Sequence, residues 1–177
     1  GLGDVYKRQA VLCMVGIIAI AILITQHQKS ALSNLPASFE RQWALRNRGQ
    51  AIEGSKGRSK VDLNILKAWD ITKGTPEVLV GILDTGIQIE SPALSASIYE
   101  NPGEKQNGRD DDQNGYIDDL HGWDFFGGSA SVFGSYLHDH HGTYLASIIA
   151  ASHAEGSPMA GIAPGVTLSL IHISEPT

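Results

Sequence analysis

The sequence predicts an α/β fold: a doubly wound parallel sheet with helices on both faces, of which this chain holds a truncated part. A near-continuous Val/Leu/Ile run over residues 77–83 indicates a parallel strand buried on both faces. Residues 142–152 have the apolar spacing of a helix, and residues 161–164 (Gly-Ile-Ala-Pro) are typical of a turn into a second strand. The order strand, loop, helix, strand indicates a parallel α/β unit.

The segments around the first strand complete the expected domain. Residues 26–60 are polar and predict a linker that leads into an N-terminal arm. Residues 61–71 have the spacing of a short helix, for which Asp62 is the expected N-cap. Between the strand and the second helix, residues 103–119 predict a long polar loop.

Both ends of the chain resemble translated sequencing adaptor, so residues 1–9 and 168–177 are expected to be non-native. A single DNA element, read once in each orientation, can encode both residues 4–9 and residues 168–173. The fold prediction therefore sets both ends aside, and the remaining residues are expected to be a fragment of a longer protein.

An apolar run without charged side chains, Ala10–Ile24, predicts a signal peptide or a membrane anchor at residues 10–25, and a buried core helix is the alternative. We therefore expect export to the extracellular side or the cell envelope, with the membrane as a partner if the segment is not cleaved.

Cys13 is the single cysteine, so no intrachain disulfide can form. The net charge of −6 gives no electrostatic footprint for nucleic acid.

Two residues carry candidate catalytic chemistry: Asp84 at the end of the predicted strand and His141 at the start of the predicted helix. Open α/β sheets place their sites at the carboxyl ends of strands, and the positive end of a helix dipole favours a neutral imidazole. An Asp followed later in the chain by a His matches two members of an Asp–His–Ser relay. The alternatives are a plain turn at residues 84–86, and a zinc site or a chance polar loop at His138–His141.

The long polar loop over residues 103–119, called the acidic loop below, is a second candidate site, for calcium. Its oxygen-bearing residues occupy alternating positions of an EF-type loop: Asp110, Asp112, Asn114, Tyr116 (through its carbonyl) and Asp118, with Gly115 at the tight turn. The twelfth position is His121 instead of a bidentate Glu, so Asp119 or Asp124 would have to substitute. Hard oxygen ligands suit Ca²⁺ in a structural role, and a solvated acidic loop is the alternative.

Three stretches together resemble the subtilisin-like serine endopeptidases of the S8 family. Residues 61–74 are similar to the helix before that family's catalytic strand, residues 78–87 to its Asp block and residues 141–151 to its His block. Residues 159–164 resemble the turn that follows. The resemblance implies a subtilisin-like fold, in which residues 61–167 form the N-terminal part of the catalytic domain.

The resemblance also implies roles for the site residues. Asp84 would orient the imidazole of His141, and His141 would take the proton of a Ser nucleophile during hydrolysis of a protein or peptide substrate. The family's Ser and oxyanion Asn motifs do not follow His141 in this sequence. We therefore expect the full-length protein to be a serine endopeptidase and this fragment to be inactive and poorly folded.

The chain departs from the family's usual pattern beside the catalytic His. Tyr144 stands where a second His is usual, and His140 stands where a small residue is usual. The alternative function is a non-catalytic, calcium-stabilised binding module of the cell envelope, derived from a protease of this family that lost its nucleophile.

Overall fold

The computed structural model describes residues 14–15, 17–26 and 32–172, except the side chains of residues 171 and 172. The chain divides into two compact units, Gly1–Leu35 and Pro36–Thr177. The predictions made for residues 1–9, for Cys13 and for residues 173–177 lie outside the described residues.

The first unit contains a helical segment, residues 17–26, whose apolar side chains are exposed. Ile17 is 67% exposed and Leu23 is 63% exposed. Within the described residues, none of the helices combines the length and the apolar character that crossing a membrane requires. The signal peptide or anchor expected at residues 10–25 lies partly outside the described residues, and it stays a prediction.

The second unit begins with the N-terminal arm. A 3₁₀ helix, η1 (Ala37–Arg41), is followed by an antiparallel hairpin of β1 (Ala51–Ile52) and β2 (Ser55–Lys56). The two turn residues, Glu53 and Gly54, have φ angles of 50° and 82°. Positive φ at both central positions is the geometry of a two-residue hairpin turn that matches the twist of its strands.

A short helix, α2 (Ile65–Trp69), covers less than the predicted range of residues 61–71. The expectation that Asp62 caps it is wrong, because Asn64 occupies the N-cap position with a φ of 52°. The Asp62 carboxylate instead accepts the backbone N–H of Asn47 at 2.6 Å and that of Asn64 at 2.7 Å. This carboxylate therefore joins the arm to the start of α2.

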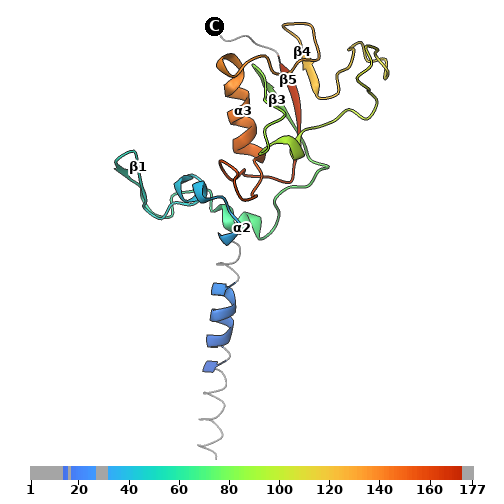
Figure 1. The fold of residues 1–177 in the computed structure, drawn as a ribbon. Coiled ribbons are helices and arrows are strands. Elements are labelled where there is room, and N and C mark those ends of the chain that lie inside the picture. Colours follow the sequence, from blue (N-terminus) through green and yellow to red (C-terminus); the bar gives the residue numbers. More distant parts are fainter. Residues whose placement is uncertain (1–13, 16, 27–31, 173–177) are drawn as a thin grey trace, which may run out of the picture. The chain divides into compact units, whose positions relative to one another are not determined.

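The sheet contains β3 (Leu79–Asp84), β4 (Gly122–Asp124) and β5 (Thr167–His172) in the order β3-β5-β4, with both neighbouring pairs parallel (Figure 1). In the register, Leu79 lies opposite Thr167, and Asp84 lies opposite His172. Parallel pairing agrees with the sequence prediction. The polar loop predicted at residues 103–119 contains no helix or strand and lies between β3 and β4 in sequence.

Strand β5 corrects one step of the prediction. The sequence predicts a non-native origin for residues 168–177, yet residues 168–172 make up most of the central strand. Leu168 is 0% exposed and Leu170 is 2% exposed, so alternate side chains of the strand enter the core. A period of two in apolar residues is sufficient for a half-buried strand whatever the origin of the segment. The non-native origin of this end stays a prediction.

Helix α3 (Tyr136–Ala150) packs against the sheet and begins six residues before the predicted start at Gly142 (Figure 1). Small side chains make the contact, since Ala146 and Ala150 are both 0% exposed. The predicted apolar face is only partly used: Leu145 is 37% exposed and Ile148 is 44% exposed.

In the described part of the chain, α3 covers one face of the sheet, whereas helices were expected on both faces. The core cluster on the α3 side includes Ile82, Leu94 and Leu168. On β3, Leu79 is 54% exposed and Leu83 is 57% exposed, because alternate residues of the strand point to the opposite face. Among the described residues, this strand is therefore buried mainly on the α3 face.

Hydrogen bonds hold the arm and α2 to the loop after α3. The side-chain amide of Gln42 donates to the carbonyl of Ala160 and accepts the N–H of the same residue, both at 2.9 Å. The indole N–H of Trp69 donates to the carbonyl of Ile162 at 2.7 Å. The Trp69 ring also contacts the His153 ring edge-on, with 4.4 Å between the ring centroids.

The partly buried His153 side chain predicts that the stability of the fold depends on pH. Burial lowers the pKa of His153, and nearby Lys73 lowers it further, although the bond to the Gly161 carbonyl opposes both. A His with a depressed pKa in the folded state stabilises the fold above its unfolded pKa of about 6.5 and loses that contribution as the pH falls. We expect the denaturant midpoint of the full-length protein to fall more between pH 8 and pH 5 in the wild type than in His153→Gln.

The control for this prediction is His138→Gln, which changes an exposed His on α3. It should keep the pH dependence of the wild type. If His153→Gln lost as much stability on acidification as the wild type, the assignment of this pH dependence to His153 would be wrong.

Candidate active site

Asp84 is the last residue of β3, and its carboxylate is held by its own turn. Oδ1 accepts the backbone N–H of Thr85 at 2.8 Å and the Thr85 hydroxyl at 3.2 Å. The same hydroxyl lies 3.3 Å from the carbonyl of His138 on α3. The turn therefore fixes one carboxylate oxygen and leaves the other, Oδ2, for a partner.

That partner is His141. Its Nδ1 lies 2.8 Å from Oδ2 of Asp84. This contact agrees with the prediction that the end of the strand and the helix lie side by side. An N–H at Nδ1 donating to the carboxylate leaves Nε2 unprotonated in the neutral ring. The His141 side chain is 65% exposed and the Asp84 side chain 10% exposed, so the carboxylate is shielded while the imidazole is accessible.

One part of the prediction for His141 is wrong. The sequence predicts this residue in the first turn of its helix, but it is the sixth residue of α3, because the helix begins at Tyr136. The helix-dipole argument for a neutral ring therefore does not apply, since the effect is confined to the first turn. The polar segment before His141 is helical because the buried Asp139 carboxylate accepts the N–H groups of Gly134 (2.6 Å) and Ser135 (2.8 Å) at the helix start.

Two glycines allow α3 to approach the end of β3. A Cβ on Gly142 would lie 2.3 Å from the Gly86 carbonyl oxygen and 3.0 Å from the Asp84 Cβ. Gly86 itself has a φ of 140°, and a Cβ there would lie 2.9 Å from the Val132 carbonyl oxygen. Both positions thus require glycine, and together they set the distance between His141 and Asp84.

Thr143 stabilises the contact between α3 and the segment that follows β3. Its hydroxyl accepts the N–H of Gln88 at 3.0 Å and donates to the Asp139 carbonyl at 3.3 Å, and the residue is buried. The sequence predicts a turn at residues 84–86, which includes Gly86, but no pattern in it indicates a separate role for Gly142 or Thr143. The His-Gly-Thr and Asp-Thr-Gly tripeptides were visible, but the contact between them depends on the packing of α3 on β3.

We predict that Gly142→Ala weakens both the fold and the site. The added Cβ must push α3 away from backbone atoms of the Asp84 turn, and overpacking of this kind costs about 1–3 kcal/mol. A displacement of about 1 Å at catalytic groups costs about 100-fold in rate. Denaturant unfolding measures the first effect, and assays of the peptidase activity expected for the full-length protein measure the second. The matched control is Gly81→Ala, where the nearest atom to an added Cβ is 4.0 Å away; equal behaviour of both variants would contradict the prediction.

The electrostatics of the pair favour an ionised carboxylate. Burial alone raises the pKa of Asp84, but the Thr85 N–H and the His141 ring together lower it by more, so the net pKa lies below its ordinary value. A carboxylate that stays ionised can hold the imidazole in one tautomer and stabilise its cation. The exposed Nε2 can then accept a proton from a group on the solvent side.

The neighbouring histidines do not assemble a metal site in the described part of the chain. Asp139 is buried and bound to backbone N–H groups, and His140 contacts the rings of Tyr136 and Tyr144. Among the described residues, the group of three potential ligands that converges lies elsewhere, in the acidic loop. The zinc alternative at His138–His141 therefore has no geometric support.

In the acidic loop, the converging side chains are Glu104, Asp112 and Asp119, each with one carboxylate oxygen within 4.8 Å of the others. The side-chain amides of Asn101 and Asn114 both donate to Asp112 and Asp119 at 2.9–3.2 Å. Glu104 is 5% exposed and accepts N–H bonds from Asp111, Asp112 and Asp118. Three carboxylates at this spacing fit a hard cation such as Ca²⁺.

This arrangement differs from the EF-type ligand set predicted above. Asp112 belongs to both sets. Asp110 accepts the backbone N–H groups of Asn114 and Gly115, and Asp112 also accepts that of Asn114. Asp118 likewise accepts those of Asn107 and Gly108, and the Tyr116 N–H is bound by the Asn114 side chain. Both residues are therefore bonded to backbone N–H groups of the loop, as Glu104 is, and neither belongs to the converging group found among the described residues. Glu104 lies outside the EF-type spacing, so the sequence pattern does not reveal it.

The comparisons with known proteins agree with this geometry. Residues 75–176 match the peptidase S8 group of sequences, described as the subtilase family. The chain is 31% identical over 99 residues to subtilisin-like protease 1 of Plasmodium berghei, which is 55% of this chain and 16% of that protein. It is 39% identical over 59 residues to human neuroendocrine convertase 2, which is 33% of this chain and 9% of that protein.

Solved structures give the same result. The chain superposes on the serine protease of Aeromonas sobria in its complex with the chaperone ORF2, with a TM-score of 0.54 and 27% identity over 76% of this chain. A second structure of that protease gives a TM-score of 0.50 with 26% identity. Both matches cover 19% of the solved chain, so this sequence spans less than a fifth of its relatives.

Proposed function

The chain belongs to the subtilase family, and on that premise we propose that it is part of a serine endopeptidase in which Asp84 and His141 are two members of an Asp–His–Ser triad. The observation that carries the proposal is the 2.8 Å contact between Asp84 Oδ2 and His141 Nδ1, with Nε2 left accessible. Asp84 would act as a positioning residue, and His141 would be the general base.

The proposed reaction is hydrolysis of a protein or peptide. A Ser Oγ attacks the scissile carbonyl carbon while His141 Nε2 takes the hydroxyl proton, and Asp84 stabilises the imidazolium that forms. When the tetrahedral intermediate collapses, His141 returns the proton to the leaving amine, and an acyl-enzyme remains. Water then adds to the acyl-enzyme in the same way, which releases the acid and restores the Ser.

We propose that the Ser comes from a part of the full-length protein outside residues 1–177. No hydroxyl among the described residues is bonded to His141, and the relatives are more than five times longer than the matched region. Ser147 is a poor candidate, because it is buried and its hydroxyl donates to the Thr143 carbonyl within α3.

The test uses a fluorophosphonate reagent, which reacts with activated serines, together with casein as substrate. We expect the full-length protein to be labelled and to hydrolyse casein, and residues 1–177 alone to do neither. Casein hydrolysis without labelling would contradict the serine mechanism. A folded full-length protein with no hydrolysis and no labelling would favour the binding-module alternative.

We further propose that the loop over residues 101–119 binds a structural Ca²⁺ through Glu104, Asp112 and Asp119. In the full-length protein, Ca²⁺ should raise the Tm, because it neutralises carboxylates that otherwise repel one another. Asp119→Asn should abolish the rise, whereas Asp111→Asn, a matched change at an exposed neighbour, should keep it. Loss of the rise in Asp110→Asn but not in Asp119→Asn would favour the EF-type ligand set instead. A wild-type Tm that did not respond to Ca²⁺ would overturn the proposal.

We propose export for the full-length protein on the basis of its apolar N-terminal run, residues 10–24. An extracellular or envelope location agrees with a peptidase that acts on proteins outside the cell. Fractionation of cells that express the full-length protein tests this, and recovery of the protein from the cytoplasm would contradict it.

A further inference from the structure

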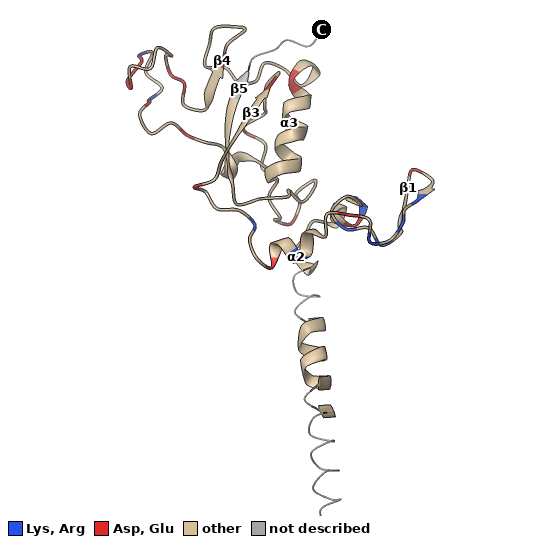
Figure 2. Cartoon of the chain, turned by 180° about the vertical axis from the view of Figure 1, so that it is seen from behind, with Lys and Arg blue, Asp and Glu red and all other residues tan. Residues whose placement is uncertain are grey.

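The N-terminal arm, defined here as Pro36–Val61, carries an excess of positive charge in an otherwise acidic chain. Its cations are Arg41, Arg46, Arg48, Lys56, Arg58 and Lys60, against the anions Glu40 and Glu53, whereas the whole chain has a net charge of −6. Figure 2 shows these basic residues along the arm around β1, and the acidic residues are concentrated elsewhere in the second unit. The arm is thus a separate, basic surface.

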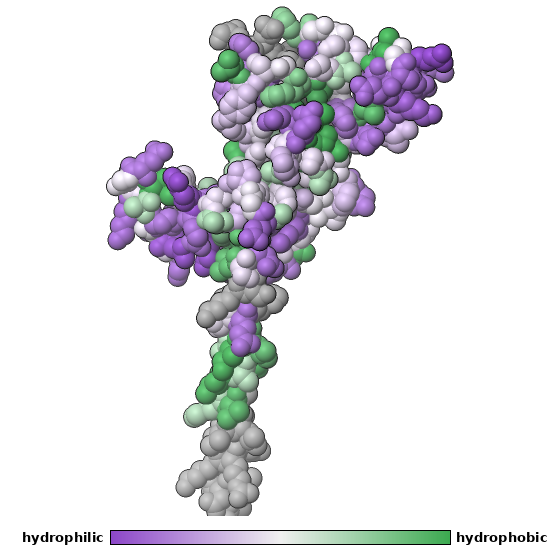
Figure 3. Space-filling model, viewed as in Figure 1, coloured by the Kyte–Doolittle hydropathy of each residue, from purple (hydrophilic) through white to green (hydrophobic). Residues whose placement is uncertain are grey.

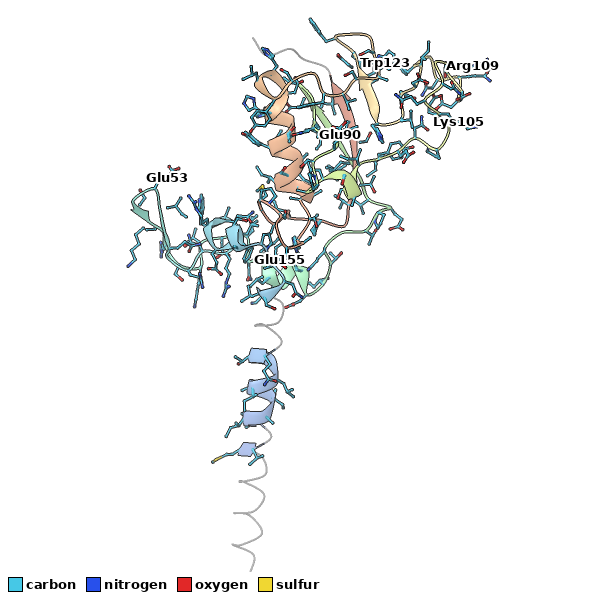
Figure 4. The ribbon with its side chains drawn as sticks, viewed as in Figure 1. Glu53, Glu90, Lys105, Arg109, Trp123 and Glu155 are labelled. Carbon is cyan, nitrogen blue, oxygen red and sulfur yellow. The ribbon has the colours of Figure 1, made fainter. Side chains whose placement is uncertain are left out.

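The three cations at the end of the arm are available to a partner. Arg48 pairs with Glu40, but Lys56, Arg58 and Lys60 are exposed, and no carboxylate of the described residues lies within ion-pair distance of them. All three follow the hairpin turn at Glu53, which Figure 4 labels on the arm. A run of exposed cations without internal partners is typical of a surface that binds an anion.

The same surface also has an apolar part. Trp43 is 50% exposed and Val61 is 56% exposed. With Ile52, Lys56 and Arg58, these two side chains help to line a hollow of about 400 Å³. Figure 3 shows hydrophilic surface over the arm with hydrophobic residues among it. Tryptophan and aliphatic side chains next to Lys and Arg are the composition of a membrane-interface segment.

The position of the arm in the chain favours a membrane over other anionic partners. The helical residues 17–26, with apolar side chains exposed throughout, end ten residues before Pro36. Such a segment is drawn to an apolar phase, and ten residues of chain keep the arm close to wherever it settles. An acidic peptide would match the cations but would leave Trp43 and the apolar segment without a partner.

We propose that the arm docks on the surface of an anionic lipid bilayer, with Lys56, Arg58 and Lys60 against the headgroups and Trp43 inserted at the interface. Each basic residue near an anionic surface contributes about fivefold in affinity. The proposal is independent of the peptidase activity, because no residue of the arm lies in the candidate active site.

The test is vesicle binding by the full-length protein in low salt. Vesicles of phosphatidylglycerol mixed with phosphatidylcholine are compared with vesicles of phosphatidylcholine alone, so that the contribution of the apolar segment cancels. We expect a preference for the anionic vesicles that falls by about 100-fold in Lys56→Gln/Arg58→Gln/Lys60→Gln and also in high salt. The matched control, Lys67→Gln/Lys105→Gln/Arg109→Gln, removes the same charge outside the arm and should keep the preference; Figure 4 labels two of its positions on the acidic loop.

A fluorescence measurement tests the contact itself. Anionic vesicles should shift the tryptophan emission of the wild type to the blue, and this shift should be largely lost in Trp43→Phe. Circular dichroism confirms that the variants are folded. Equal binding to both vesicle types, equal losses in the arm and control variants, or an unchanged shift in Trp43→Phe would each overturn the proposal. Arm-dependent binding of polyglutamate or inorganic phosphate without binding to anionic vesicles would also overturn it.

Discussion

Replacing His141 by Gln is expected to abolish the peptidase activity proposed for the full-length protein, with kcat about six orders of magnitude lower. This is the size of loss measured when a catalytic triad loses its histidine. The physical reason is that Nε2 of His141 is the group expected to accept the nucleophile's proton, and a carboxamide has no basic nitrogen to replace it. Casein hydrolysis, followed over several days for the variant, measures the effect.

The control is His138→Gln. His138 is an exposed histidine of the same helix and the same His-rich run, and its contact with the Asp84 turn is made by its backbone carbonyl. This variant should hydrolyse casein at close to the wild-type rate. An active His141→Gln protein, or an equally inactive His138→Gln protein, would show that the proposed general base is wrong.

Replacing Asp84 by Asn is expected to lower kcat by about four orders of magnitude while leaving the fold intact. The Asn side chain has the same shape, but its amide can donate a hydrogen bond to Nδ1 of His141. The imidazole would then carry its proton on Nε2 and could not accept a second one without becoming an unsupported cation. Steady-state kinetics should therefore show a fall in kcat with little change in KM.

Asp70→Asn is the matched control, because Asp70 follows α2 in the sequence and is exposed. Its kcat should equal that of the wild type. If Asp84→Asn retained more than a tenth of the activity, the carboxylate would be a turn residue only. That outcome would favour the alternative for residues 84–86 that was open at the level of sequence.

The two chemical groups could be found from sequence because each belongs to a local pattern. The Val/Leu/Ile run before Asp84 predicts a strand that ends at a carboxylate, and the structure has β3 over Leu79–Asp84. The order of strand and helix then predicts that the two elements lie side by side, and Nδ1 of His141 is within 2.8 Å of Asp84. Fold class and family are confirmed by the comparisons, whereas the catalytic roles stay predictions.

The predictions that differ from the structure depended on contacts between distant residues. The EF-type spacing names Asp110 and Asp118, whereas the carboxylates that converge are those of Glu104, Asp112 and Asp119, and which set binds an ion stays a prediction. Ligand convergence in a long loop depends on which turns form, and the spacing of acidic residues does not contain that information.

The amino-acid sequence alone determined the fold class, the family and the two residues proposed for the proton relay. The reason is that the type of each side chain sets its tendency to be buried and its capacity to form hydrogen bonds. Tertiary structure alone decided where α3 begins, which face of it is buried and that residues 168–172 form the central strand. It also decided that glycines at 86 and 142 set the approach of helix to strand. These outcomes depend on how closely backbones from different segments can pack, which no single stretch of sequence specifies.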